Sequence, residues 1–243
     1  MEVDFDTVTS ERLGELLAHA DGRLRADAAC ALGDRLRVRE LEQLGPLQPR
    51  LVELLADPVF LVRLEAAIAL AEVGDTRGTD VLVEGLGVRS HRLDAIRALG
   101  TMGDRRAIPP LARLLDRWLL PWADRLQAAA ALCALEDARG AIYLEERLHS
   151  RRRAERAAAI HFMGESKHPR AKECLGGLLD NPREPLRDVV ARALGLLGDP
   201  STRASLQAAL ETADAELRSD IQDALAKLDS PTQPVSGPSE TSD

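Results

Sequence analysis

Hydrophobic and polar positions along this chain follow one short pattern that recurs seven times. Each copy opens with an arginine, and after two variable residues come a small or aliphatic pair, one variable residue, usually an alanine, and then a leucine or methionine. These apolar positions fall on one side of an α-helix, so each copy predicts a helix with one buried side. The opening arginines are Arg25, Arg63, Arg92, Arg125, Arg156, Arg187 and Arg218.

A second landmark divides each copy into two helices. A leucine precedes five of the seven arginines by eight residues, and we expect it to end a first helix that a short turn joins to the second. A period of about 30 residues is typical of stacked repeats, whose units cannot bury their apolar sides alone. The sequence therefore predicts an all-α solenoid of seven antiparallel helix pairs, fourteen helices in all and no β-sheet, over residues 9–229. The residues expected to be almost fully buried include Ala67, Leu70, Leu99, Leu132 and Leu194.

Glycine and aspartate close several units. A glycine can adopt the left-handed conformation that ends a helix, and the aspartate after it can cap the next one. Two prolines at the start of a first helix fit its first turn, where a missing N–H is tolerated. These residues are Gly74-Asp75, Gly103-Asp104, Gly198-Asp199, Pro109 and Pro110.

The repeated Arg-x-x-Ala-Ala-x-Ala-Leu phrase and its Gly-Asp ending resemble the HEAT-repeat family, in the short bacterial form also called phycobilin-lyase-type HEAT-like repeats. The resemblance covers about residues 9–229. It implies a right-handed α-α superhelix, with the first helices outside and the second helices lining the concave side.

Composition narrows the class of protein. Hydrophobic residues make up 45% of the 243 residues, yet aromatic residues only 2%, and an Ala- and Leu-rich chain suits closely stacked helices. The formal net charge of −8 argues against a nucleic-acid partner, since such proteins are usually basic. The acidic start without an apolar run predicts no signal peptide, and no segment is apolar enough to span a membrane. Three widely spaced cysteines then indicate a reduced, cytoplasmic protein.

Three irregularities interrupt the repeat. About seven extra residues stand in the segment 35–43, which can lengthen a helix by two turns. The turn around residues 88–90 is shortened by two residues, and the turn 117–123 is lengthened by two. Residues 230–243 are rich in Pro, Ser and Thr and are predicted to form a disordered tail after the solenoid at 1–229.

The acidic end of the concave face is the first candidate site. Variable positions two, five and nine residues after each arginine share one side of the second helix. In the first three units they carry five acidic residues, which suit an extended or helical peptide with basic residues at one end and aliphatic residues beyond. A merely solvated helix face stays an alternative. The acidic residues are Asp27, Asp34, Glu65, Glu72 and Asp94.

The lengthened turn is the second candidate site. It concentrates large apolar side chains, which a structural turn does not need, and is expected to project from the solenoid edge with at least one exposed tryptophan. We expect a partner or self-association contact here, against the alternative that the rings cover the repeat stack. The residues are Trp118, Leu119, Leu120 and Trp122.

The sequence gives little evidence of a catalytic or metal site. The five histidines are scattered, and the repeated His-Glu pairs of iron-binding HEAT-like hydroxylases are missing. No phosphate loop, nucleophile elbow or metal-ligand spacing occurs, so we predict no catalytic residue, cofactor or metal site. The arginine-rich segment 147–156 is interpreted as a solvated turn, because glutamates interrupt it, and an anion-binding patch stays the alternative. The seven repeat arginines are expected to lock one unit on the next rather than to bind an anion.

These observations favour a non-catalytic scaffold or adaptor that binds a protein or peptide partner. The alternative is an enzyme-associated accessory role like that of the phycobilin lyases, which share the repeat type. A HEAT-like DNA glycosylase is disfavoured, because it needs a basic groove with aromatic residues.

Overall fold

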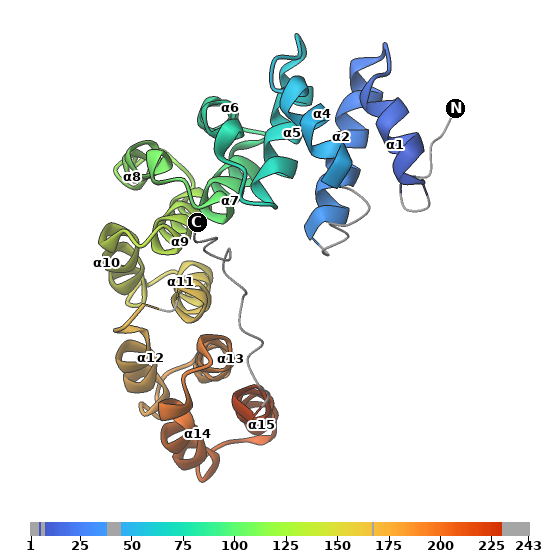
Figure 1. The fold of residues 1–243 in the computed structure, drawn as a ribbon. Coiled ribbons are helices and arrows are strands. Elements are labelled where there is room, and N and C mark those ends of the chain that lie inside the picture. The colour runs from blue at the N-terminus through green and yellow to red at the C-terminus, as the bar shows by residue number, and fades with distance from the viewer. Residues whose placement is uncertain (1–4, 6–7, 38–44, 167, 230–243) are drawn as a thin grey trace, which may run out of the picture. The chain divides into compact units, whose positions relative to one another are not determined.

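The computed structural model describes residues 5, 8–37, 45–166 and 168–229. The predicted tail at 230–243 and most of the inserted segment 35–43 lie outside the described residues. The described part contains fourteen α-helices and no β-strand, as the repeat predicts (Figure 1). The chain divides into two compact units, residues 1–143 and 144–243, which we call unit 1 and unit 2.

Unit 1 is built from successive pairs of helices, in which a first and a second helix pack against each other. Short 3₁₀ turns precede three of the first helices: η1 (Gly45–Leu47), η2 (Thr76–Gly78) and η3 (Arg105–Ala107). The pairs are α1 (Ser10–Leu17) with α2 (Gly22–Arg37), α4 (Gln48–Leu54) with α5 (Phe60–Ala71), α6 (Thr79–Gly85) with α7 (Arg92–Met102), and α8 (Ile108–Leu115) with α9 (Trp122–Ala134).

Unit 2 continues the same alternation. Its first helices α12 and α14 lie on one side, and its second helices α11, α13 and α15 lie on the other (Figure 1). The helix α10 (Ala138–Arg147) crosses the boundary between the units. The others are α11 (Arg153–Glu165), α12 (Ala171–Leu179), α13 (Arg187–Leu197), the turn η4 (Pro200–Thr202), α14 (Arg203–Leu210) and α15 (Ala215–Asp229).

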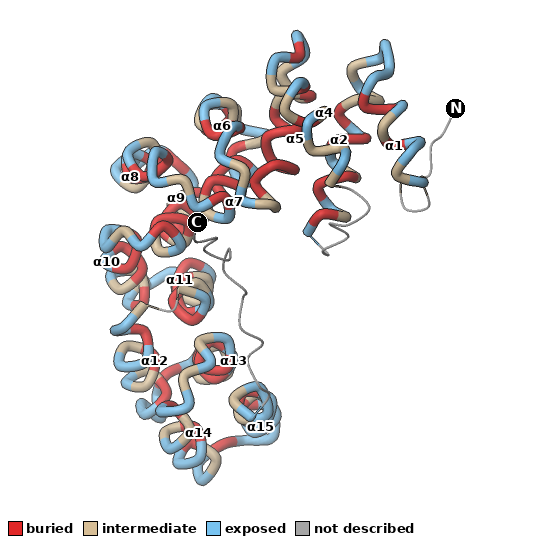
Figure 2. The backbone as a smooth tube through the Cα atoms, viewed as in Figure 1, coloured by how far each residue is buried: buried red, intermediate tan, exposed pale blue. Residues whose placement is uncertain are grey.

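The core of each unit runs along the sides of the helices that face their neighbours (Figure 2). Leucine and alanine fill it, as the composition indicates. The five residues expected to be buried, Ala67, Leu70, Leu99, Leu132 and Leu194, all have no exposed surface.

Second helices approach each other closely through glycine and alanine. A Cβ atom added to Gly33 in α2 would lie 3.1 Å from Cα of Ala69 in α5, and one added to Gly164 in α11 would lie 2.5 Å from a backbone oxygen of α13. Each such glycine stands eight residues after its repeat arginine, and the facing alanine stands six after the next one. The recurring small residues therefore set the distance between repeats.

Helix ends follow the predicted glycine-aspartate rule. Gly74, Gly103 and Gly198 have φ angles of 72°, 78° and 68°, in the left-handed region. The aspartate after each glycine accepts the backbone N–H two residues on, as the 2.9 Å bond from Arg106 to Asp104 illustrates. In the fourth repeat Glu136 takes the left-handed position, with φ of 58°.

The repeat arginines of unit 1 tie each turn to the next. Arg92 is 8% exposed; its Nε donates to the carbonyl of Leu86 at 2.8 Å and its Nη1 to Asp124 in the following turn at 3.0 Å. Arg25 reaches Asp57 in the following turn at 2.8 Å and holds the pKa of that carboxyl below its usual value.

Unit 2 repeats this arrangement. Arg156 pairs with Glu184, and Arg187 donates to the carbonyl of Leu179 at 3.0 Å and to Oγ1 of Thr212 at 3.2 Å. These contacts support the structural role expected of the arginines. The buried Nε atoms of Arg125 and Arg156 have no hydrogen-bond partner among the described residues.

Candidate functional site

A hollow of about 270 Å³ opens on the second-helix side of unit 1, between α2, α5 and α7. Six of its nine lining residues stand two, five or nine positions after a repeat arginine, so the repeat pattern located this surface correctly. We call it the acidic hollow. It is lined by Cys30, Gly33, Asp34, Arg37, Glu65, Ile68, Ala69, Asp94 and Arg97.

Glu65 dominates the electrostatics of the acidic hollow. Burial raises the pKa of its carboxyl, and the negative charges of Asp94, Asp34 and Asp27 raise it further. Asp27 does not line the hollow itself and acts on Glu65 through its charge. Among the described residues, Glu65, Asp27 and Asp94 form no ion pair, so a cation placed between them would relieve their repulsion.

Cys30 shares this environment. Cys30 is an exposed residue, yet the partial burial of its thiol, followed by the charges of Glu65 and Asp34, raises the pKa of that thiol to about 11. The thiol is therefore protonated and poorly nucleophilic at neutral pH. The three cysteines of the chain are free thiols.

Glu72 corrects one expectation. Its carboxylate lies between Nη2 of Arg37 at 3.1 Å and Nη1 of Arg97 at 3.0 Å, and its side chain is only 6% exposed. Glu72 is thus neutralised within the chain and is not available to a partner. The sequence pattern did not include Arg37. This residue lies twelve positions after Arg25, beyond the positions two, five and nine, on an extra helical turn that the long helix α2 provides.

The lengthened turn between α8 and α9 exposes two apolar side chains. The N–H of Leu120 donates to the carbonyl of Arg117 at 2.8 Å, which places Trp118 and Leu119 at the two corner positions of a tight turn. Each of these side chains is 78% exposed. The expected exposure of at least one tryptophan is confirmed.

The other two apolar residues of this segment behave differently from the prediction. Leu120 is 8% exposed and belongs to the core of unit 1, because the turn reverses the chain and directs this residue inward. Trp122 is half-buried and opens α9 instead of lying in the turn. Trp118 and Leu119 are the exposed apolar residues of this segment, and contact of Trp118, Leu119 or the half-buried Trp122 with a partner stays a prediction.

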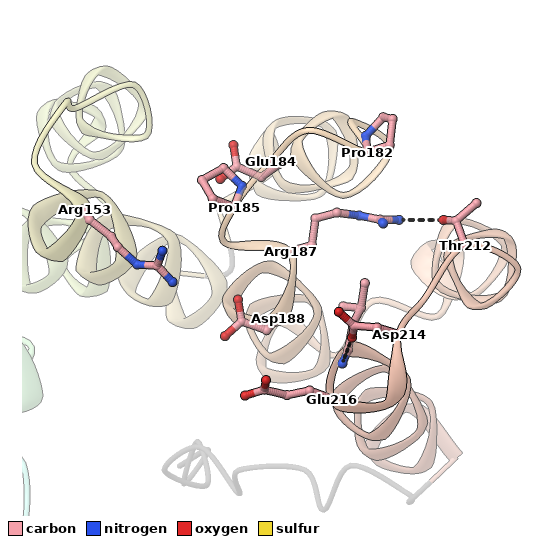
Figure 3. A pocket seen from close by; sticks show the side chains of 10 residues that line it. Arg153, Pro182, Glu184, Pro185, Arg187, Asp188, Thr212, Asp214 and Glu216 are labelled. Atoms are coloured by element: carbon pink, nitrogen blue, oxygen red, sulfur yellow. Dashed lines mark hydrogen bonds between the residues drawn. The ribbon is translucent and has the colours of Figure 1, made fainter.

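A second hollow, of about 410 Å³, lies in unit 2 where α11, α13 and α15 begin (Figure 3). Arg153, Asp188 and Glu216 line it from these three helix starts. Several of its groups are already engaged, since Arg187 donates to Thr212 and Asp214 accepts the N–H of Leu217 at 2.9 Å. The repeat pattern did not single out this hollow, because none of its lining residues stands two, five or nine positions after a repeat arginine.

The second-helix side of unit 2 balances its charges locally. Arg192 in α13 lies 3.0 Å from both Asp188 and Asp220, and His161 lies 3.4 Å from Glu165. In the basic segment 147–156, Arg156 pairs with Glu184, whereas Arg151 and Arg152 are exposed.

The described residues contain no group of three or more His, Cys, Asp or Glu side chains placed to hold a metal ion. None of their helices combines the length and the apolar composition that crossing a membrane requires.

Comparison with solved structures finds similar folds. A chain of the CpcE and CpcF complex of phycocyanin lyase from Nostoc sp. PCC7120 is 21% identical, with a TM-score of 0.57, covering 91% of this chain and 95% of that chain. Human deoxyhypusine hydroxylase is 21% identical, with a TM-score of 0.43, covering 90% of this chain and 84% of that one. At such identities the likeness concerns the fold alone.

Sequence comparison identifies the repeat. No curated protein matches the sequence. The family model for HEAT repeats matches residues 10–93 and 141–226, and the model for the PBS lyase HEAT-like repeat matches residues 92–117. The chain therefore belongs to the HEAT-repeat family.

Proposed function

We propose that this protein is a non-catalytic scaffold whose acidic hollow takes a lysine or arginine side chain from a peptide segment of a partner protein. The observation that carries the proposal is the group formed by Asp27, Glu65 and Asp94, which form no ion pair among the described residues, although Arg37 and Arg97 line the same hollow. A partner's ammonium or guanidinium group would add positive charge beside these carboxylates and favour the ionised form of Glu65.

The size of the hollow agrees with a side chain as ligand. Its volume of about 270 Å³ is below the roughly 300–1,000 Å³ of a small-molecule pocket. Ile68 offers an apolar wall to the aliphatic stem of lysine or arginine, and the carboxylates meet its charged end. Arg37 and Arg97 flank Glu72 at the side, which disfavours a second cation there.

A peptide titration tests this proposal. Labelled peptides of one neutral sequence would carry a single lysine, arginine or norleucine at the same place, and fluorescence anisotropy would report binding. The double variant Glu65→Gln/Asp94→Asn should weaken binding of the basic peptides roughly tenfold to 100-fold, as loss of charge-assisted contacts implies. The matched control is Asp80→Asn in α6, whose side chain is 94% exposed.

Proton release provides an independent readout. Since the pKa of Glu65 is raised in the free protein, a bound cation should lower it and expel a proton in mildly acidic solution. Calorimetry in two buffers of different ionisation enthalpy measures that release. Equal binding of the norleucine peptide, or wild-type affinity in the double variant, would refute the proposal.

An accessory role in bilin attachment is the alternative. It draws on the shared repeat type and on no individual residue of this chain. Absorbance spectra after incubation with a bilin distinguish the two functions, because a scaffold for basic peptides should leave the free-bilin spectrum unchanged.

A further inference from the structure

We propose that the turn formed by Trp118 and Leu119 is a second docking surface, which binds an acidic segment of a partner protein that also carries aliphatic or aromatic side chains. This surface and its ligand are distinct from the acidic hollow, so the inference does not depend on the function proposed above.

The turn exposes apolar surface that folding would otherwise remove from water. Trp118 and Leu119 are each 78% exposed at the corners of a turn, where glycine, proline, asparagine or aspartate is usual. Contact with a partner would remove this apolar surface from water, which is favourable. The next residue, Leu120, is buried in the core of unit 1, so this segment borders an apolar interior. Trp118 and Leu119 nevertheless lie outside that interior.

Exposed arginines outnumber the one exposed carboxylate, Asp116, in the segment that leads into this apolar pair. Arg113 at the end of α8 and Arg117 in the turn are exposed and form no ion pair or side-chain hydrogen bond among the described residues. The same holds for Arg89 in the turn of the preceding repeat. The bridge from Arg92 to Asp124 joins the two turns along one edge and neutralises the buried carboxylate there.

Charge complementarity selects the occupant. The edge is locally basic on a chain whose net charge is −8, which favours an acidic ligand. A second copy of this chain would fit poorly, because a two-fold contact through the turn would place Arg117 against its own equivalent. An exposed tryptophan beside arginines is the composition of protein-interface hot spots, and Leu119 adds area that base stacking would not use.

Tryptophan emission offers a direct test. In a Trp122→Phe protein, Trp118 is the one remaining tryptophan and reports on its own surroundings. The probes are amphipathic peptides with leucine and phenylalanine at helical spacing and glutamate elsewhere, the same peptides with lysine for glutamate, and a single-stranded oligonucleotide. The acidic peptides should shift the emission to shorter wavelength and protect Trp118 from iodide quenching, whereas the lysine peptides should do neither.

Variants separate the two components of the surface. Anisotropy of the labelled acidic peptide should show affinity at least tenfold lower for Trp118→Ala, and again for Arg113→Glu/Arg117→Glu. The matched controls are Ile142→Ala, which removes another apolar side chain that is 56% exposed, and Arg23→Glu, which reverses another exposed arginine. Both should bind as the wild type does. Circular dichroism verifies that every variant is folded.

Four outcomes would overturn the proposal: no acidic peptide binds at about 1 mM, Trp118→Ala binds as tightly as the wild type, the oligonucleotide competes for Trp118, or the emission shift follows protein concentration without peptide. The last two would assign the surface to nucleic acid or to a second copy of the chain.

Discussion

The second helices of the two units present the same repeat positions to solvent but balance their charges differently. In unit 1, Glu65 and Asp94 form no ion pair among the described residues, and burial keeps the pKa of Glu65 raised. In unit 2, Arg192 sits between Asp188 and Asp220, each 3.0 Å away. One backbone arrangement therefore supports carboxylates without an ion pair in one place and carboxylates that share an arginine in another.

In this repeat, the positions that stabilise the stack of helices differ from those that we propose to face a partner. Arginine ties the turns together, and glycine against alanine sets the spacing of second helices in both units. The positions two, five and nine residues after each arginine are not the ones that set this spacing, although Ile68 joins the core and Arg97 pairs with Glu72 between two second helices. Their charges differ between the units while the glycine and alanine recur, so we infer that these positions carry recognition.

The largest expected effect tests whether the two units share one scaffold. Leu99 and Leu194 each stand seven residues after a repeat arginine and have no exposed surface. Truncation of either to alanine should lower the free energy of unfolding by roughly 2–5 kcal/mol through lost burial and a cavity. Urea denaturation measures both. Leu93→Ala, at a side chain that is 47% exposed, serves as the control; a loss under about 0.5 kcal/mol at Leu99 would contradict the assigned helix face.

Glycine substitutions test whether the second helices of both units depend on the same close spacing. A Cβ at Gly164 of unit 2 would lie 2.5 Å from a backbone oxygen, whereas one at Gly100 of unit 1 would lie 3.0 Å from Cα of Ala131. Gly164→Ala should therefore destabilise by about 1–3 kcal/mol, more than Gly100→Ala. In Gly176→Ala the added atom meets nothing within 4 Å, so the better helix propensity should stabilise by up to about 1 kcal/mol. Thermal unfolding ranks the three variants, and a stabilised Gly164→Ala would disprove the close approach.

Sequence periodicity accounted for most of the scaffold and part of the site. The arginine phrase placed the helices and the buried leucines, because those positions obey local helical geometry. It also located Cys30, Asp34 and Glu65 on one surface. It could not reveal that Arg37 neutralises Glu72, since that contact joins residues 35 apart. Nor could it show that Leu120 turns inward, which depends on a hydrogen bond within one turn.

Neutralising one carboxylate in each unit should have opposite effects on stability. The pKa of Glu65 is raised in the folded protein, so its charge opposes folding at neutral pH and Glu65→Gln should stabilise unit 1. Asp220→Asn removes a partner of Arg192 and should destabilise unit 2. Each change should be below about 1 kcal/mol, because the groups are partly solvated.

The pH dependence of the free energy of unfolding shows whether the charge of Glu65 opposes or favours folding. A raised folded-state pKa means that stability falls as pH rises from the unfolded value of about 4.3 through the folded value. The gain from Glu65→Gln should therefore vanish below that range and be complete above it. Denaturation curves at several pH values measure this, and a gain that grows toward acidic pH would show that Glu65 is stabilised by a cation after all.

The smallest expected effect is on the protonation, and so the reactivity, of the Cys30 thiol. Burial and the carboxylates of the hollow raise the pKa of this thiol to about 11. In a Cys133→Ser/Cys174→Ser protein, Cys30 is the one thiol left to react. Near pH 8 it should be alkylated on the order of 100-fold more slowly in the folded protein than in denaturant. Glu65→Gln removes the largest charge contribution and should accelerate the reaction several-fold, whereas Asp220→Asn should leave it unchanged. Iodoacetamide labelling followed by mass spectrometry gives both rates. If Cys30 reacts as fast folded as unfolded, the carboxylates of unit 1 do not act together, and the contrast with the balanced charges of unit 2 is lost.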